Sequence, residues 1–286
     1  MSKSLDSCAV HIIGLGLMGG SLAMALRGKV GRITAEDISP HVLEQATARG
    51  VIDATGTVAG ADIVIVAIPA NLIITLLPTL DVTPGTLVID LGSTKTRICQ
   101  QLDALPDGVL AVGGHPMCGL AENGYANAIP TLYAGARFVL CETAHTSSEA
   151  CALAEALVAA VGAHPRWMDR AQHDYLTALT SHLPHLLSFA LMRLAVEAGN
   201  GDAALYDLAA GGFDGATRLA RTDEAMIVGM FSTNADQLRR VTARLRDHLD
   251  QLDAMLEDVD YLHEELGAIV EARRAYTARY GERLIT

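Results

Sequence analysis

The sequence predicts an α/β protein in which a doubly wound parallel sheet is followed by an all-helical domain. Between residues 8 and 168, short β-rich apolar runs alternate with helical patterns, which is typical of a parallel sheet with crossover helices. After residue 168 the strand signals stop and helical patterns continue, with polar breaks around residues 199–201 and 211–215. We therefore predict two domains, residues 1–168 and residues 169–286.

The first domain is expected to contain strands at residues 8–13, 32–36, 62–68, 86–90, 109–112, 137–141 and 164–168. The run 63–68 is continuously apolar, as in a strand that is buried on both faces of a sheet. Pro69 ends this run long before the ~20 residues that a membrane helix needs, so we predict no membrane segment. Ligands of open α/β sheets bind beyond the carboxyl ends of the strands. We therefore expect the functional residues in the loops that follow the strands.

A glycine motif directly follows the first predicted strand. Gly14, Gly16 and Gly19 have the spacing G-x-G-x-x-G, and a helical pattern follows them. In this context the first glycine makes a tight turn, and the second lets a pyrophosphate approach the backbone. The third lets the helix and the strand pack closely. The motif predicts a dinucleotide-binding domain of the Rossmann type.

An acidic residue follows the second predicted strand. Asp37 lies 18 residues after Gly19, where a carboxylate binds the ribose hydroxyl groups of a dinucleotide; Glu36 is the alternative. Ile38 and Ser39 come next, so no arginine stands there to hold a 2′-phosphate. We therefore expect NAD as the cofactor rather than NADP.

Composition excludes several other classes of function. The net charge of −12 argues against nucleic acid as a partner, because phosphate backbones are bound by clustered lysines and arginines. The five cysteines form no C-x-x-C pair, so neither a metal site nor a disulfide framework is expected, and a cytoplasmic location suits them. The partner that these features favour is a small-molecule substrate.

Two polar groups follow later strands. Ser93 and Thr94, after the strand at 86–90, either cap the next helix or offer hydroxyl groups to a ligand. His115 comes after the strand at 109–112, between glycines and a proline. Its place beside a dinucleotide site favours a catalytic role, since a neutral imidazole can take a hydroxyl proton as hydride leaves.

A third group lies in the helical region. Ser181 and His185 are four residues apart and share a helix face, and His182 is three residues from His185. Pro184 removes a helical hydrogen bond, so the local geometry is expected to be unusual. Arg218 follows a glycine-rich segment, where its guanidinium would bind either a substrate carboxylate or a carboxylate of the protein itself.

The last part of the chain predicts an interface. Between residues 235 and 280, apolar residues recur three or four positions apart, which indicates one apolar stripe on a very long helix. One small domain cannot cover such a stripe, so we predict a homodimer through the C-terminal helices. Packing within a single chain is the alternative.

Five short motifs together resemble the prephenate/arogenate dehydrogenase family, the NAD(P)-dependent dehydrogenases of tyrosine biosynthesis. In chain order they are GLGLMGGS at 14–21, DLGSTK at 90–95, GHPM at 114–117, SHLPH at 181–185, and the pairs Gly212-Phe213 and Thr217-Arg218. The resemblance covers most of the chain. It implies a nucleotide-binding domain followed by a helical dimerisation domain.

The resemblance also implies an activity, the oxidative decarboxylation of prephenate to 4-hydroxyphenylpyruvate with NAD. It implies that His115 accepts the proton of the ring hydroxyl and that Ser93 orients this hydroxyl near the nicotinamide. Arg218 would bind a substrate carboxylate, in a pocket lined by residues of the SHLPH motif, namely Ser181, His182 and His185.

One segment departs from the family pattern. After the GHPM motif many relatives continue with Ala-Gly, a threonine or serine, a glutamate and a lysine, whereas this chain has CGLAEN at 118–123. Arogenate dehydrogenase and cyclohexadienyl dehydrogenase therefore stay open as alternatives, as does an amino-substituted substrate. A β-hydroxyacid dehydrogenase would need a catalytic lysine in the helical half, but Lys95 is the last lysine. A non-catalytic NAD-sensing regulator is the alternative from another class.

Overall fold

The computed structural model describes residues 3–120, 122–201 and 203–281. The chain divides after Ala235 into two compact units. The first contains the sheet and the helices up to α10, and the second contains the two C-terminal helices. All residues that the sequence singles out for chemistry lie in the first unit.

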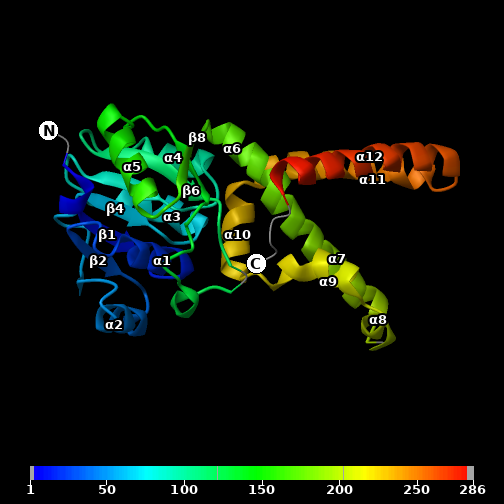
Figure 1. Ribbon diagram of the computed structural model, residues 1–286, viewed down its shortest axis with the longest axis horizontal. Helices are drawn as coiled ribbons and strands as arrows, with labels where there is room; N and C mark the ends of the chain where they lie inside the picture. The colour runs from blue at the N-terminus through cyan, green and yellow to red at the C-terminus, as the bar shows by residue number, and fades with distance from the viewer. Residues whose placement is uncertain (1–2, 121, 202, 282–286) are drawn as a thin grey trace. The chain divides into compact units, whose positions relative to one another are not determined.

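Eight strands form one sheet in the order β3-β2-β1-β4-β5-β6-β7-β8 (Figure 1). Their bounds are β1 Ala9–Ile13, β2 Arg32–Glu36, β3 Ala54–Thr55, β4 Ile63–Val66, β5 Leu87–Asp90, β6 Leu110–Pro116, β7 Arg137–Cys141 and β8 His164–Trp167. The first six have the order of a Rossmann sheet, which confirms the predicted fold class. The sequence did not predict β3, because a strand of two residues has no measurable periodicity.

The parallel sheet changes direction between β6 and β7. β1 to β6 are parallel, but β7 pairs with β6 in the antiparallel sense, and β8 is parallel to β7. The described residues of the connection from β6 to β7 form no α-helix. A helical crossover is needed only between parallel strands, so an antiparallel pair can do without one. The carboxyl ends of β7 and β8 therefore lie at the opposite edge of the sheet from those of β1 to β6.

Helices cover both faces of the sheet. α1 (Leu17–Leu26) and α5 (Ser148–Ala160) pack on one face, and α3 (Ala70–Leu76) and α4 (Thr96–Leu102) on the other. α2 (Pro40–Ala48) follows β2, and its Ala46 joins the core on the α1 face. The two apolar layers fix the strands between them. They thereby fix the positions of the loops at the carboxyl ends of β1 to β6.

A continuous helical segment follows β8 (Figure 1). It consists of α6 (Arg170–Thr177), a π-helical turn (Ala178–His182) and α7 (Leu183–Gly199). Pro184 has no N–H to donate within the helix, and the wider π turn lies directly before it, as such turns often do at functional sites. The unusual geometry expected around Pro184 is therefore a single π turn.

Short helices complete the first unit. They are α8 (Ala203–Asp207), α9 (Gly211–Thr217) and α10 (Glu224–Thr233), with a 3₁₀ turn at Arg218–Arg221. The break predicted at 199–201 is present, since α7 ends at Gly199 and Asn200 is left-handed with φ 41°. The break predicted at 211–215 is wrong, because these residues form α9. α10 packs on α3, where a Cβ at Gly229 would lie 2.7 Å from Asn71 Oδ1.

The single long helix predicted over 235–280 is also wrong. The second unit has two helices, α11 (Ala235–Met255) and α12 (Val259–Tyr280). Asp258 starts α12 by accepting a hydrogen bond from the backbone N–H of Tyr261 at 3.0 Å, which is ordinary N-cap chemistry. Apolar periodicity runs across the break, so it did not reveal the interruption. In the described part of the chain, no helix is long and apolar enough to cross a membrane.

Candidate active site

The glycine motif makes the turn that the sequence predicts. Gly14 has φ +93°, and a Cβ there would lie 2.7 Å from the carbonyl oxygen of Ala67. A Cβ at Gly19 would lie 1.9 Å from the carbonyl oxygen of Gly14, so only glycine lets α1 approach β1 this closely. Gly16 is the N-cap of α1. Apart from Gly16 and its two chain neighbours, no described residue has an atom within 4 Å of its Cβ position.

This open side of Gly16 has the features of a pyrophosphate cradle. The first N–H groups of a helix have no partner within it, and they favour a negative charge in front of them. A side chain at position 16 would fill the space that a pyrophosphate needs for contact with the backbone. The residues present therefore fit a dinucleotide.

Asp37 lies directly after β2, beside this turn. Its Oδ2 accepts the backbone N–H of Leu15 at 2.7 Å, and its Oδ1 accepts that of Ser39 at 2.8 Å. Both bonds hold the carboxylate at the carboxyl end of β2, next to the glycine motif. Glu36, the alternative, is the last residue of β2, and burial raises the pKa of its carboxyl group.

A buried ion pair supports the strand that carries His115. Asp90, at the end of β5, and Lys95 are fully buried and form an ion pair. The carboxylate of Asp90 also accepts the backbone N–H groups of Gly92 and Gly114, at 2.8 Å and 3.0 Å. The ammonium group of Lys95 donates to the carbonyl oxygen of Gly114 as well. This pair therefore joins the loop after β5 to the residue just before His115.

His115 lies within β6, opposite Val139 of β7. The sequence placed it in the loop after a strand ending at residue 112, which is wrong because β6 continues to Pro116. Its side chain is partly exposed. Burial of the ring and the nearby His173 and Lys95 hold its pKa well below the usual value of a histidine, so the imidazole is neutral near pH 7.

Two residues that the sequence analysis did not single out lie on the buried side of His115. His173 Nε2 lies 2.8 Å from His115 Nδ1, and His173 Nδ1 lies 2.8 Å from Asp174 Oδ1. Both belong to α6, and their exposed fractions are only 1% and 2%. A His-Asp pair just before the SHLPH motif was the available signal, but only the fold shows that it reaches His115.

Asp174 also positions the loop that carries Ser93. Its two carboxylate oxygens accept the backbone N–H groups of Lys95 and Thr96, each at 2.7 Å. This carboxylate caps α4, the role that the sequence allowed for Ser93 or Thr94. Thr94 is buried, with its hydroxyl 2.8 Å from that of Thr233 on α10. Ser93 is only partly buried.

The hydrogen bonds to Asp174 decide its charge. Burial opposes ionisation of the carboxyl group, but the bonds from His173 and from the amides of Thr96 and Lys95 outweigh it. Its pKa is therefore lower than usual. For His173 burial prevails over the attraction of Asp174, and its pKa is lowered too. The pair is thus a neutral imidazole beside a carboxylate.

The π turn places Ser181 and His182 differently. His182 is fully buried, and its Nδ1 lies 3.1 Å from Nδ2 of Asn234. The same Nδ2 donates to the carbonyl oxygen of Asp174 at 2.8 Å. Burial lowers the pKa of His182 to about 4. His182 therefore belongs to the buried layer around Asp174, whereas Ser181 is partly exposed.

Arg218 lies close enough to His185 to affect its pKa. His185 Nδ1 donates to the carbonyl oxygen of Ser181 at 2.9 Å. Burial lowers the pKa of His185, and the positive charge of Arg218 adds to this effect. The turn that carries Arg218 is tied to α7, because the buried hydroxyl of Ser188 accepts the N–H of Ala220 at 2.9 Å.

Electrostatic influence links four of the predicted site residues, His115, His182, His185 and Arg218. His182 influences the pKa of His115, His185 that of His182, and Arg218 that of His185. The helical segment thus brings its polar residues toward the strand end where His115 lies. Among the described residues there is no group of three or more His, Cys, Asp or Glu side chains that could hold a metal ion.

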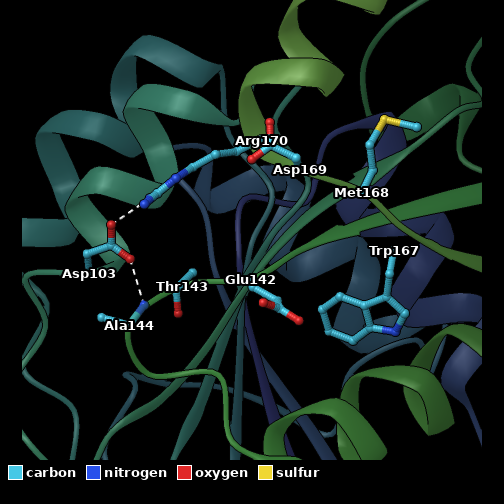
Figure 2. Close-up of a pocket in the computed structure, with 8 residues that line it drawn as sticks. All are labelled: Asp103, Glu142, Thr143, Ala144, Trp167, Met168, Asp169 and Arg170. Atoms are coloured by element: carbon cyan, nitrogen blue, oxygen red, sulfur yellow. Dashed lines mark hydrogen bonds and ion pairs between the residues drawn. The ribbon is translucent and has the colours of Figure 1, made fainter.

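A separate hollow of about 740 Å³ lies at the opposite edge of the sheet (Figure 2). Its lining residues are Asp103 after α4, residues 142–144 after β7, and residues 167–170 from the end of β8 to the start of α6. None of them is a predicted site residue. Arg170 pairs there with Asp103 at 2.5 Å, and Asp103 accepts the N–H of Ala144 at 2.7 Å. The hollow therefore marks where α6 is fastened to the end of α4, three residues before His173.

Comparison with known proteins agrees with this architecture. The family model described as the nucleotide-binding domain of prephenate dehydrogenase matches residues 22–166. The model described as the prephenate dehydrogenase dimerization domain matches residues 169–269. Together they cover most of the chain.

Individual proteins similar to this chain are prephenate dehydrogenases and a cyclohexadienyl dehydrogenase. Prephenate dehydrogenase of Lactococcus lactis is 32% identical over 255 residues, which cover 85% of this chain and 70% of the relative. Cyclohexadienyl dehydrogenase of Zymomonas mobilis is 28% identical over 281 residues, covering 93% and 95%. The crystal structure of Aquifex aeolicus prephenate dehydrogenase with hydroxyphenyl propionate and NAD+ has a TM-score of 0.89 and 28% identity, covering 96% and 100%.

Proposed function

The chain belongs to the prephenate dehydrogenase family, and we propose from this that it oxidises and decarboxylates prephenate to 4-hydroxyphenylpyruvate with NAD. The observation that carries the proposal is the position of His115. It is a partly exposed, neutral imidazole at the end of β6, on the edge of the sheet where the glycine motif lies. A base at this place is what the reaction requires.

Each site residue has a role in this proposal. His115 takes the proton of the ring hydroxyl, and Ser93 orients that hydroxyl. Arg218 binds a carboxylate of the substrate, and Ser181 and His185 line the same pocket. His182 supports this pocket from the buried layer, since it is fully buried. Gly14, Gly16 and Gly19 hold the pyrophosphate, and Asp37 holds the ribose hydroxyl groups.

In this reaction the protein mainly has to position the reactants, because the reaction itself is energetically favourable. NAD held by Gly14, Gly16, Gly19 and Asp37 would supply the acceptor for the hydride that leaves the ring carbon carrying the hydroxyl. The O–H proton goes to His115, the C–O bond becomes a carbonyl, and the C–C bond to the ring carboxylate breaks to release carbon dioxide. The electrons of that bond make the ring aromatic. Aromatisation drives the reaction, so the protein mainly orients the reactants and moves one proton.

A homodimer completes the proposal. The family model for the second region is that of a dimerization domain, and large apolar side chains of α11 and α12 such as Leu249, Val259, Leu266 and Ile269 are exposed in the single chain. Pairing of the C-terminal helices between two copies would cover them. We further assign nucleotide binding to residues 1–168 and substrate binding and dimerisation to residues 169–286. Location in the cytoplasm stays a prediction from the cysteines.

A second candidate substrate is arogenate, because the Zymomonas mobilis relative is a cyclohexadienyl dehydrogenase. Steady-state NADH formation with prephenate and with arogenate, each with NAD and with NADP, decides between them. We expect turnover of prephenate with NAD. Exclusive turnover of arogenate would contradict the substrate, and no turnover of either would favour a sensor of NAD.

A further inference from the structure

We propose that His173 and Asp174 form a relay that sets the tautomer of His115 and stabilises the charge that His115 acquires. The proposal rests on the function proposed above, because it assigns a task to the residues behind the base. His173 and Asp174 are positioning residues in this scheme. Only His115 meets the substrate.

The relay begins at Asp174. Its Oδ1 accepts the N–H of Lys95 at 2.7 Å and faces His173 Nδ1 at 2.8 Å, while Oδ2 accepts the N–H of Thr96 at 2.7 Å. An ionised carboxylate has no proton to donate. His173 must therefore carry its proton on Nδ1 and donate it to Asp174.

The tautomer of His173 then determines that of His115. A neutral imidazole with a proton on Nδ1 has a lone pair on Nε2. His173 Nε2 lies 2.8 Å from His115 Nδ1, so Nδ1 of His115 must donate the proton of this bond. The two rings meet edge to face, with an interplanar angle of 75°. His115 is left with a bare Nε2, the form that can accept a proton.

Burial gives the relay a direction. His173 and Asp174 are 1% and 2% exposed, whereas His115 is partly exposed. The lone pair of His115 is on the ring nitrogen that does not face the buried layer. A proton can therefore enter only from the outer side, where the substrate hydroxyl would lie.

The proton balance closes over one turnover. The hydroxyl proton binds Nε2 of His115, which becomes an imidazolium and strengthens its bond to His173. The positive charge of this chain of two rings is balanced by the carboxylate of Asp174. When carbon dioxide has left, the ring oxygen is a phenolate, and it takes the proton back from Nε2. No proton crosses the buried layer.

Imidazole nitrogen signals in the NMR spectrum test the tautomers directly. In the free protein labelled with ¹⁵N-histidine, we expect His115 and His173 both to carry the proton on Nδ1, although free histidine prefers Nε2. The variants His115→Asn and His173→Gln assign the two sets of signals. A proton on Nε2 of His115 near pH 7 would overturn the relay, even for an enzyme that turns over prephenate.

Kinetics of two variants at position 173 test its consequence. His173→Leu removes the acceptor for His115, and we expect kcat to fall by about 10² or more with KM little changed, as for a base whose tautomer is lost. His173→Gln keeps an acceptor oxygen at the place of Nε2 and should restore part of kcat. Equal kcat in the Leu variant and the unaltered enzyme would overturn the proposal, as would equal losses in the two variants.

A matched control separates this effect from the loss of any buried histidine. His11 in β1 is fully buried with one hydroxyl partner, Thr34, at 2.9 Å. His11→Asn should leave kcat and the NMR signals of His115 unchanged, and a matching loss of kcat there would make the effect of His173 merely structural. Failure to oxidise prephenate or arogenate at all would instead contradict the proposed function, and the tautomers would still be measurable.

Discussion

Asp90 and Lys95 form an ion pair that is fully buried beneath the strand carrying His115. Each partner also bonds to the backbone of Gly114, so the two charges hold the end of β6 where His115 lies. Lys95→Met would leave the carboxylate of Asp90 buried without its cation. We expect a loss of about 3–5 kcal/mol in the free energy of unfolding, measured by urea denaturation.

The exposed pair of Lys3 and Asp62 is the control for this prediction, with side chains 51% and 29% exposed. Lys3→Met should cost less than about 1 kcal/mol, as surface pairs do. Similar losses for both lysine variants would show that burial of the Asp90 pair does not matter.

The role of His115 predicts a loss of rate rather than of affinity. His115→Asn should lower kcat by about 10²–10⁴, the usual contribution of a general base, and change the KM for prephenate little. Steady-state kinetics with saturating NAD measure both. Near-normal kcat in this variant would exclude the assignment.

Arg218 should act on binding. Arg218→Ala is expected to weaken the apparent affinity for prephenate by roughly 2–5 kcal/mol if the ion pair with the substrate is desolvated. Arg221→Ala on the same turn is the control. The side chain of Arg221 is 71% exposed and forms a long ion pair of 3.7 Å with the exposed Glu122, so its removal should cost little. An effect of Arg221→Ala as large as that of Arg218→Ala would contradict the specific role.

Asp37 should determine the choice of cofactor. Asp37→Ser removes the carboxylate that would bind the ribose hydroxyl groups, so the ratio of kcat/KM for NAD to that for NADP should fall. Glu36→Gln, one residue earlier, should leave the ratio unchanged. A lower ratio in the Glu36 variant alone would move the role to Glu36.

Buried His11 should make the fold sensitive to acid. Burial lowers its pKa to about 4 from an ordinary value of 6.5, so the unfolded chain binds the proton more readily. Its contribution reduces stability as pH falls from 6.5 toward 4, by up to about 3 kcal/mol. The free energy of unfolding of His11→Asn, followed over this range, should fall less steeply than that of the unaltered protein. Parallel curves for the two proteins would contradict it.

The sequence by itself determined the features that are local. The glycine spacing after an apolar strand, the alternation of strands and helices and the order of the five motifs depend on neighbours along the chain, and they predicted the fold class and the family. The exact ends of helices and strands were predicted less well. His115 lies inside β6 and not in the loop after it. Apolar periodicity continues across the break between α11 and α12, so the sequence pattern did not reveal this break.

Only the tertiary structure decided which groups meet. His173 is 58 residues from His115, and Asp174 is 79 residues from Lys95, so no local pattern relates them. Their contacts exist because α6 packs beside the end of β6 and the start of α4. The charge of Asp174 and the proton positions of both imidazoles follow from burial and from these partners, which are properties of packing and not of any segment alone.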